Sequence, residues 1–474
     1  MKKLICIALA LIMFLSLAAC GGKDPAGPAE PTAAPEKTAE PASTQDAQAT
    51  ENGGDTPRPF ATQTPDRQAF DPETDADNRY TCTNIKLIET EGGFYWLTWS
   101  AAYFYLLYYD EGLDEVIPVC SKPECEHFKD GNLNEQNTKC DAYIYAAQYP
   151  SLYKGKMYYL FSYGAPNPNT NEQTLGNKLY RMDPDGTHKE FIKDVFPPGF
   201  DSGPQIIHRG VIYSFTHESR IVNGEAESRA MMLALPMDGD ETSCRVLYEI
   251  DKSCWGGLRF VGDRCYFWLS YADGEYLEDE DGIPIVDHLI PGGVIGYWDS
   301  AEEKLEILFD GQFAQGDVNN LDEMWVTQDE AIYVTLSTGL ARFENGEFTL
   351  TASFEDPEHE YCPPKISDGI VILREKTNGR YRPEEDPIWW IMDFDGNTLY
   401  KAPLPMGWID EKGLDRREGS LAYLGGDANA LYVDFTFRMM EDEYEYLVRY
   451  DLVDGELIPT FFGPLYAGPT EENW

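Results

Sequence analysis

Basic residues are scarce in this sequence. Its 474 residues include 83 Asp and Glu against 37 Lys and Arg, which gives a formal net charge of -46. A surface with this charge repels phosphate backbones and anionic lipid headgroups, so we expect no nucleic-acid partner. The same repulsion makes polyanions poor ligands.

Long apolar runs are also missing, except at the start of the chain. Lys2 and Lys3 precede the apolar residues 4–19, a pattern typical of a secretory signal peptide. The segment Leu17-Ala18-Ala19-Cys20 resembles the lipobox of bacterial lipoproteins, in which cleavage precedes the cysteine and the sulfur carries a diacylglycerol. The resemblance implies lipidation of Cys20 and a membrane anchor on the outer face of the bacterial cell membrane. The alternative is a cleaved signal peptide followed by an incidental cysteine.

The next segment has almost no residues that could build a core. Residues 21–70 contain no Leu, Ile, Val, Met, Tyr or Trp, but hold 8 Pro, 10 Ala and 7 Thr. Such a composition predicts a solvated, disordered linker. We therefore expect a signal peptide over 1–19, the lipidated cysteine and linker over 20–79, and a folded domain over 80–474.

Sustained helical spacing of apolar residues is absent beyond about residue 80. Short runs of β-branched and aromatic residues alternate with Gly, Asp, Asn and Pro, which predicts an all-β domain. The runs recur as seven pairs, in which a strand of the type Gly-x-Tyr is followed by a strand that ends in an acidic turn. The first strands of these pairs contain residues 93–96, 155–159, 210–213, 262–267, 331–333, 369–372 and 430–433.

This repeat predicts a β-propeller of seven four-stranded blades, with six or eight as alternatives. The repeats, especially Lys178–Thr187, resemble the low-density-lipoprotein-receptor-like repeats of a bacterial domain family of unknown function, and more distantly the TolB propeller. The resemblance implies a fold and no activity. The longest insertions are expected at 165–176, 272–291 and 376–387.

One cluster of metal-binding residue types stands out. Cys120, Cys125, His127 and Cys140 offer three thiols and an imidazole within a short stretch, which matches the ligand set of a tetrahedral structural zinc site. Four protein ligands would leave no position for a catalytic water.

A disulfide framework competes with this zinc hypothesis. Setting aside Cys6 and Cys20 leaves an even number of cysteines outside the membrane, which would fit four disulfides. These are Cys82, Cys120, Cys125, Cys140, Cys244, Cys254, Cys265 and Cys362.

Two further groups of residues invite a ligand. Acidic turns such as those at 183–186, 238–241, 393–396 and 454–456 could hold calcium. Asp-Gly is also what tight hairpin turns require, so we favour structural turns over calcium sites. The segment 278–281 is the exception for which a calcium test is worthwhile.

Tryptophans could stack sugars at the mouth of the central channel, although most should belong to the core. The candidates are Trp96, Trp99, Trp255, Trp389 and Trp390.

Catalytic motifs are lacking. The sequence has no Gly-x-Ser-x-Gly, no His-Glu-x-x-His and no phosphate-binding loop, and its six histidines are scattered. We therefore expect a monomeric, non-catalytic module that binds a glycan, a peptide or a protein. The alternatives are a carbohydrate-active glycosidase or lyase and an envelope-assembly factor.

Overall fold

The computed structural model describes residues 69–80, 87–100, 103–125, 140–144, 147–166, 173–196, 205–222, 225–273, 277–278, 284–285, 290–313, 321–376, 386–439 and 442–469. All of them belong to one compact unit. Within these ranges, no helix has the length and apolar character needed to cross a membrane.

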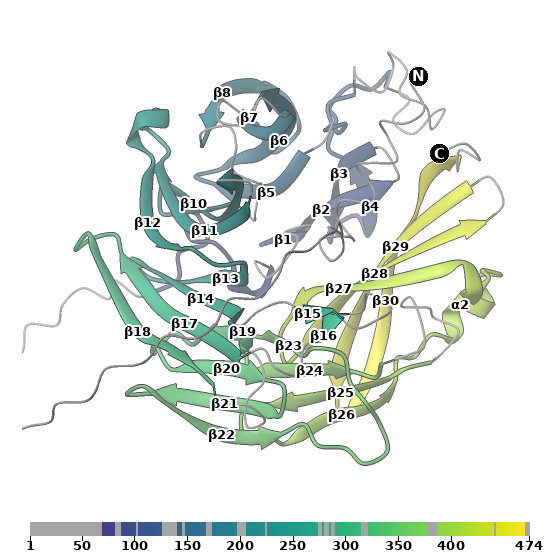
Figure 1. Ribbon diagram of the computed structural model, residues 1–474. Helices are drawn as coiled ribbons and strands as arrows, with labels where there is room; N and C mark the ends of the chain where they lie inside the picture. The colour runs from purple at the N-terminus through teal and green to yellow at the C-terminus, as the bar shows by residue number, and fades with distance from the viewer. Residues whose placement is uncertain are drawn as a thin grey trace, which may run out of the picture. The chain divides into compact units, whose positions relative to one another are not determined.

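The described residues form seven antiparallel sheets of four strands each, arranged in a ring (Figure 1). The expectation of a seven-bladed β-propeller is therefore confirmed. Blade 1 holds β1 (Leu87–Thr90), β2 (Gly93–Ser100), β3 (Tyr103–Asp110) and β4 (Glu115–Pro118). Blade 2 holds β5 (Ala147–Tyr153), β6 (Lys156–Pro166), β7 (Gln173–Met182) and β8 (Glu190–Val195). Blade 3 holds β9 (Gln205–His208), β10 (Val211–Val222), β11 (Glu225–Pro236) and β12 (Arg245–Ile250).

The remaining blades follow in chain order. Blade 4 holds β13 (Cys254–Val261), β14 (Arg264–Asp273), β17 (Ile290–Asp299) and β18 (Lys304–Gln312), with the small β15 (Leu277–Glu278) and β16 (Pro284–Ile285) hairpin between β14 and β17. Blade 5 holds β19 (Leu321–Val326), β20 (Ile332–Leu336), β21 (Gly339–Glu344) and β22 (Glu347–Ser353). Blade 6 holds β23 (Lys365–Ser367), β24 (Ile370–Arg374), β25 (Ile388–Asp393) and β26 (Thr398–Pro403). Blade 7 holds β27 (Gly419–Gly426), β28 (Ala430–Met439), β29 (Asp442–Val453) and β30 (Glu456–Pro469).

Helical segments are few and short in the described residues. They are η1 (Asn78–Tyr80), η3 (Glu241–Ser243), α2 (Gly407–Glu411) and η5 (Arg416–Glu418).

Each strand pair predicted from the Gly-x-Tyr pattern is the central hairpin of a blade. In blade 1, for example, Phe94 of β2 pairs with Tyr109 of β3, and Trp96 pairs with Leu107. Aromatic and aliphatic side chains on these central strands point to both faces of the sheet, because neighbouring blades cover both faces. The hydrophobic core therefore lies between blades; Trp96 and Trp389, for example, are 0% and 1% exposed.

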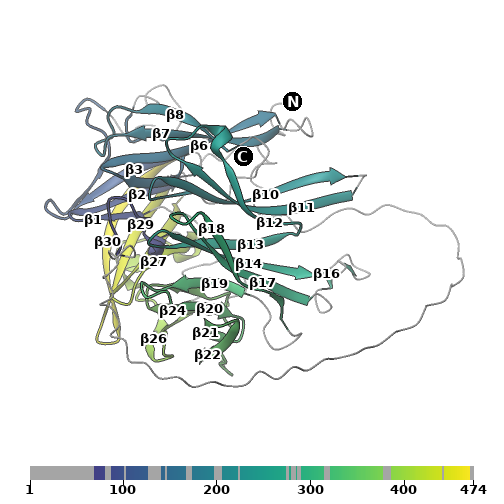
Figure 2. The same cartoon turned by 90° about the vertical axis from the view of Figure 1, so that its left-hand side faces the viewer.

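The two faces of the ring differ in their connections. The first strands of several neighbouring blades adjoin, as β13 and β19 do, and the first strands lie on the inner side of the ring, around its central channel (Figure 1). Because the strands alternate in direction, all turns from first to second strand lie on one face, and all connections from second to third strand lie on the other. Figure 2 shows β10, β11 and β16 projecting toward the same side, which is the second face. The predicted insertions at 165–176, 272–291 and 376–387 are all connections of this second kind.

The described residues begin at residue 69, upstream of the domain boundary that we expected at residue 80. Residues 69–80 make hydrogen bonds to several blades, beginning with the backbone N–H of Lys154, which donates to the carbonyl of Glu73 at 2.8 Å. The signal peptide, Cys20 and most of the linker lie outside the described residues.

Candidate metal centre

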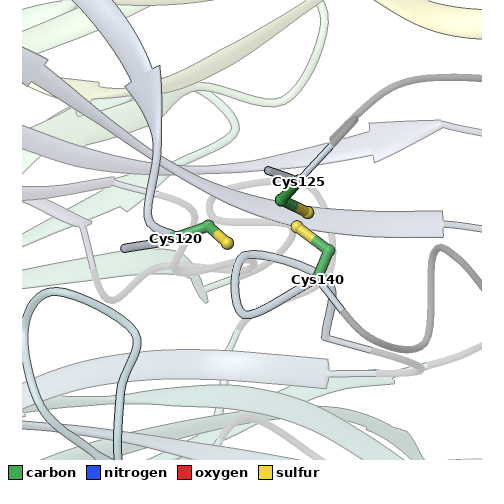
Figure 3. Close-up of side chains that lie close together, drawn as sticks. All are labelled: Cys120, Cys125 and Cys140. Carbon is green, nitrogen blue, oxygen red and sulfur yellow. The ribbon is translucent and has the colours of Figure 1, made fainter. Parts of the chain in front are cut away.

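The structure brings three of the four predicted metal ligands together. The Sγ atoms of Cys120, Cys125 and Cys140 all lie within 4.8 Å of one another. Figure 3 shows the sulfurs of Cys125 and Cys140 pointing toward each other, with that of Cys120 facing the same space. His127, the fourth predicted ligand, lies outside the described residues.

The cluster sits where the outermost strand of blade 1 is interrupted. β4 pairs with β3 only as far as Pro118, opposite Leu107. The remaining half of β3 pairs with a later segment, because the N–H of Leu106 donates to the carbonyl of Ala142 at 2.9 Å and Tyr105 forms a bridge with Tyr143. Residues 140–144 therefore take the place of β4 beside the first half of β3. The three thiols lie where β4 and the 140–144 segment meet, and we call this place the junction.

A turn of blade 2 packs directly on the same junction. Gly186, in the turn between β7 and β8, has a φ of 84°, and a Cβ there would lie only 2.1 Å from the carbonyl oxygen of Val119. Glycine is thus required both by the backbone conformation and by the close approach. The acidic turn seen in the sequence therefore has a packing role beside Cys120.

Hydrogen bonds favour the thiolate form of one cysteine. Burial alone would raise the pKa of Cys120, but hydrogen bonds from the backbone N–H groups of Lys122 and Asp141 and from the two other thiols lower it. The N–H of Asp141 lies 3.4 Å from the sulfur of Cys120. Burial raises the pKa of Cys140 to about 12 and also raises that of Cys125. Cys120 therefore favours the thiolate form, whereas a metal would have to displace the protons of Cys125 and Cys140.

Two lysine side chains lie near the thiols. Lys122 forms an ion pair with Asp141, with 2.8 Å between Nζ and Oδ1. Lys189 donates to the carbonyl of Tyr143 at 3.0 Å, and burial lowers its pKa although Asp141 and Cys140 oppose that shift. These ammonium groups would offset the negative charge that three thiolates bring to a divalent cation.

The three sulfurs lie close enough together for one metal ion to bind them all. Thiolates at about 2.3 Å from a tetrahedral zinc lie roughly 3.8 Å from one another, so small shifts from the observed positions would complete the coordination. A disulfide needs a sulfur separation of about 2.05 Å and would use only two of the three thiols.

The disulfide framework, which was the alternative to zinc, is absent among the cysteines that the structure describes. Cys254 and Cys265 are on adjacent strands, but Cys254 pairs with Tyr271 and Cys265 with Phe260, so the two lie far apart along the ladder. All cysteines that the structure describes are free thiols. Cys82 lies outside the described residues.

The tryptophans divide as expected between core and surface. Trp96 and Trp389 are buried, and Trp390 is half-buried on blade 6, with the ammonium of Lys401 4.0 Å from its ring. Trp255 is 45% exposed and is the second residue of β13, an innermost strand. It therefore lies at the mouth of the channel on the face of the long connections. The side chain of Trp99 is outside the described residues.

An acidic residue that the sequence analysis did not single out lies on another channel strand. Asp322 falls at a β-bulge of β19, between Leu321, which pairs with Leu336, and Glu323, which pairs with Thr335. Burial, together with the charge of Glu323, raises the pKa of Asp322 to about 6. No sequence signal marks a bulge, which explains why this residue was missed.

Acidic turns serve as turns where the structure describes them. In the 183–186 turn, Asp183 binds Lys156 and His188, and Asp185 accepts from the N–H of Thr187 at 3.0 Å. Asp454 and Gly455 have φ values of 51° and 81°, as a tight hairpin requires. Most of the 278–281 segment lies outside the described residues.

The fold defines the chain as a β-propeller protein. No family model matches it. No curated protein matches it either.

Several solved structures are similar to the chain, with low TM-scores and low sequence identity. An ulvan lyase, from a new family of polysaccharide lyase, has a TM-score of 0.42 and 10% identity, covering 82% of this chain and 97% of the lyase. A periplasmic gluconolactonase of Pseudomonas aeruginosa has a TM-score of 0.35 and 10% identity, covering 78% and 99%. An acylaminoacyl peptidase of Pyrococcus horikoshii has a TM-score of 0.38 and 11% identity, covering 84% and 54%. Likenesses at these levels carry no argument about function.

Proposed function

We propose that the chain is a lipid-anchored bacterial surface protein whose β-propeller acts as a non-catalytic binding module. The observation that carries the binding role is Trp255, which is 45% exposed at a channel mouth although tryptophan is costly to leave in water. An exposed aromatic ring beside a channel is the feature that sugar-binding and peptide-binding sites share. The net charge of -46 favours neutral glycans and cationic peptides over polyanions.

The lipid anchor rests on the Leu17–Cys20 motif. Metabolic labelling of the producing cells with an alkyne-bearing fatty acid tests it directly. Labelled wild-type protein and unlabelled Cys20→Ala protein are expected, while Cys6→Ala serves as the matched control and keeps its label. Labelling of the Cys20→Ala protein would contradict the anchor.

The binding role is tested with an array of neutral glycans, anionic glycans and cationic peptides. Trp255→Ala is expected to weaken binding of a neutral or cationic ligand by about twofold to tenfold, since stacking on one aromatic ring contributes about 0.5–1.5 kcal/mol. Trp390→Ala, away from the channel, is the matched control and should bind as the wild type does. Retention of anionic glycans alone would contradict the proposal.

The cysteine cluster serves in this proposal as a structural zinc centre. Cys120, Cys125 and Cys140 supply three ligands, and His127 is the expected fourth. A zinc ion there would fasten the 140–144 segment to β3 and hold the first blade to the second. With all positions taken by protein, it would have no catalytic role.

Asp322 supports an alternative function, a carbohydrate-active enzyme. A carboxyl group with a pKa of about 6 can serve as a general acid or base near neutral pH. Incubation with the neutral glycans that bind on the array separates the two functions. Release of new reducing ends by the wild type, but not by Asp322→Asn, would establish the enzyme; unchanged glycan would support the binding module.

A further inference from the structure

Residues 69–80 lie against one mouth of the channel, on the face of the turns from first to second strand. The N–H of Lys154 in blade 2 donates to Glu73, and the N–H of Arg209 in blade 3 donates to Thr74, both at 2.8 Å. In Figure 1 the purple chain before β1 runs through the middle of the ring, near β13. The segment is thus bonded to successive blades through its backbone.

Side chains strengthen this contact at blades 3 and 4. Arg209 pairs with Asp75 at 2.7 Å and with Asp263 of blade 4 at 2.8 Å. Asn78 binds the backbone of Phe260 twice, accepting from its N–H at 2.9 Å and donating to its carbonyl at 2.7 Å. A side-chain amide that makes both bonds imitates a paired strand.

The same segment bridges the seam between the last blade and the first. Arg79 pairs with Glu89 of blade 1 at 2.6 Å and with Asp427 of blade 7 at 3.2 Å. Tyr80 is 2% exposed and packs edge-on against Tyr432 of blade 7, with ring centroids 6.1 Å apart.

A glycine makes room for this contact. A Cβ at Gly425 of β27 would lie 2.5 Å from both the carbonyl oxygen of Arg79 and the ring of Tyr80. The last blade is therefore shaped to receive residues that precede the first blade.

The seam needs such a bridge because no strand is shared across it. Blade 1 consists of β1 to β4 and blade 7 of β27 to β30, so in the described chain each sheet is built from one continuous stretch. Without a shared strand, no backbone ladder joins the first blade to the last. Side-chain contacts, such as the 2.8 Å hydrogen bond from Tyr432 to Glu89, must hold the two together.

We propose that residues 69–80 are a latch that closes the ring, in the role that a strand shared by the first and last blades would otherwise fill. The latch occupies part of the mouth on its own face. On the proposed function, the ligand would therefore bind at the other mouth, beside Trp255.

The latch does not fill its mouth completely. A cavity of about 750 Å³ remains on the side of blades 5 and 6, lined by residues 69–70 and 76–79 of the latch together with residues 325–329 and Asp368. The hydrogen bonds and ion pairs described above join the latch to blades 1, 2, 3, 4 and 7, which agrees with a latch that fastens the seam and its neighbours.

Amide hydrogen exchange on the full-length protein in detergent tests this role. In the wild type, residues 76–80 are expected to exchange slowly, as part of the fold. Arg79→Gln is expected to speed exchange about tenfold in residues 69–80, β1 and β27, because these elements meet at the seam. Arg245→Gln is the matched control, since Arg245 pairs with Glu303 at 2.9 Å on the exposed surface.

Three results would overturn the latch. The first is exchange of residues 76–80 in the wild type at the rate of an unfolded peptide, a result that does not depend on any variant folding. The second is unchanged exchange of β1 and β27 in Arg79→Gln. The third is equal acceleration in all seven sheets, which would show general destabilisation in place of an effect on the seam.

Discussion

The backbone N–H of Asp141 donates a hydrogen bond to the sulfur of Cys120, at 3.4 Å and across 21 residues of sequence. This bond places the 140–144 segment beside the end of β4 and brings Cys140 to the other two thiols. Together with the Lys122 ion pair to the side chain of Asp141, it shows that the junction is shaped by more than the cysteines alone.

Removing one thiol should remove the metal and its stabilisation. Cys125→Ser is expected to bind no zinc, and chelation of the wild type is expected to lower the free energy of unfolding by about 3 kcal/mol when the metal was present at about 100 times its dissociation constant. Thermal unfolding with and without chelator measures the effect. Cys362→Ser, outside the cluster, is the control and should respond to chelator as the wild type does.

A larger residue at Gly186 should destabilise the packing of the blade 2 turn on Val119 without changing a candidate metal ligand. Gly186→Ala places a Cβ 2.1 Å from the carbonyl of Val119, while Gly346→Ala has nearly the same φ, 83° against 84°, and nothing within 4 Å. Both substitutions carry the cost of a positive φ, about 1 kcal/mol. Urea unfolding is expected to show a larger loss for Gly186→Ala. Equal losses would mean that the blade 2 turn is not tightly packed on Val119.

Replacing a buried tryptophan should lower the free energy of unfolding much more than replacing an exposed one. Trp96→Ala empties a fully buried site and is expected to cost about 3–5 kcal/mol. Trp255→Ala removes an exposed ring and is expected to change the free energy of unfolding by about 0.5 kcal/mol or less. Urea unfolding of both variants checks this. A large loss in Trp255→Ala would assign that ring to the core and remove the argument for a ligand.

Stability should depend on pH through the latch. The N–H of Ala76 donates to Nδ1 of His208 at 3.1 Å, and Nε2 donates to the carbonyl of Gly262 at 2.7 Å, so this histidine is bound as the neutral ring. Burial lowers the pKa of His208 below its usual 6.5, although Gly262, Asp75 and Asp263 favour the charged form and Arg209 opposes it.

The sign of the effect follows from that lowered pKa. Below pH 6.5 the unfolded chain binds a proton that the folded chain resists, so stability falls as the pH drops from 6.5 through the lower pKa of the folded state. His208→Gln keeps a donor and an acceptor but does not titrate. Thermal unfolding from pH 8 to pH 5 should therefore show a smaller decline for His208→Gln than for the wild type, and parallel declines would contradict the role of His208.

The ring was predictable because its signal repeats. Each blade needs a central hairpin that is apolar on both faces, so motifs such as Gly155–Tyr159 and Gly369–Ile372 recur along the chain and predict the number of blades. The three cysteines were predictable for a similar reason, since thiols at close spacing have few structural roles.

The latch and Asp322 were not predictable, for physical reasons. The latch is a short polar segment that has no hydrophobic period, and its contacts reach residues such as Phe260 and Asp427 that are distant in sequence. The pKa of Asp322 depends on burial and on the bulge in β19, which only the packed structure creates. Polar contacts between distant residues leave no local pattern to read.

Metal content and free thiols, measured together on the purified protein, test the cysteine centre most directly. The account predicts one zinc per chain and no reaction of Cys120, Cys125 or Cys140 with a thiol reagent until a chelator is added. A metal-free protein in which these three thiols react freely, or in which two of them are joined in a disulfide, would contradict it.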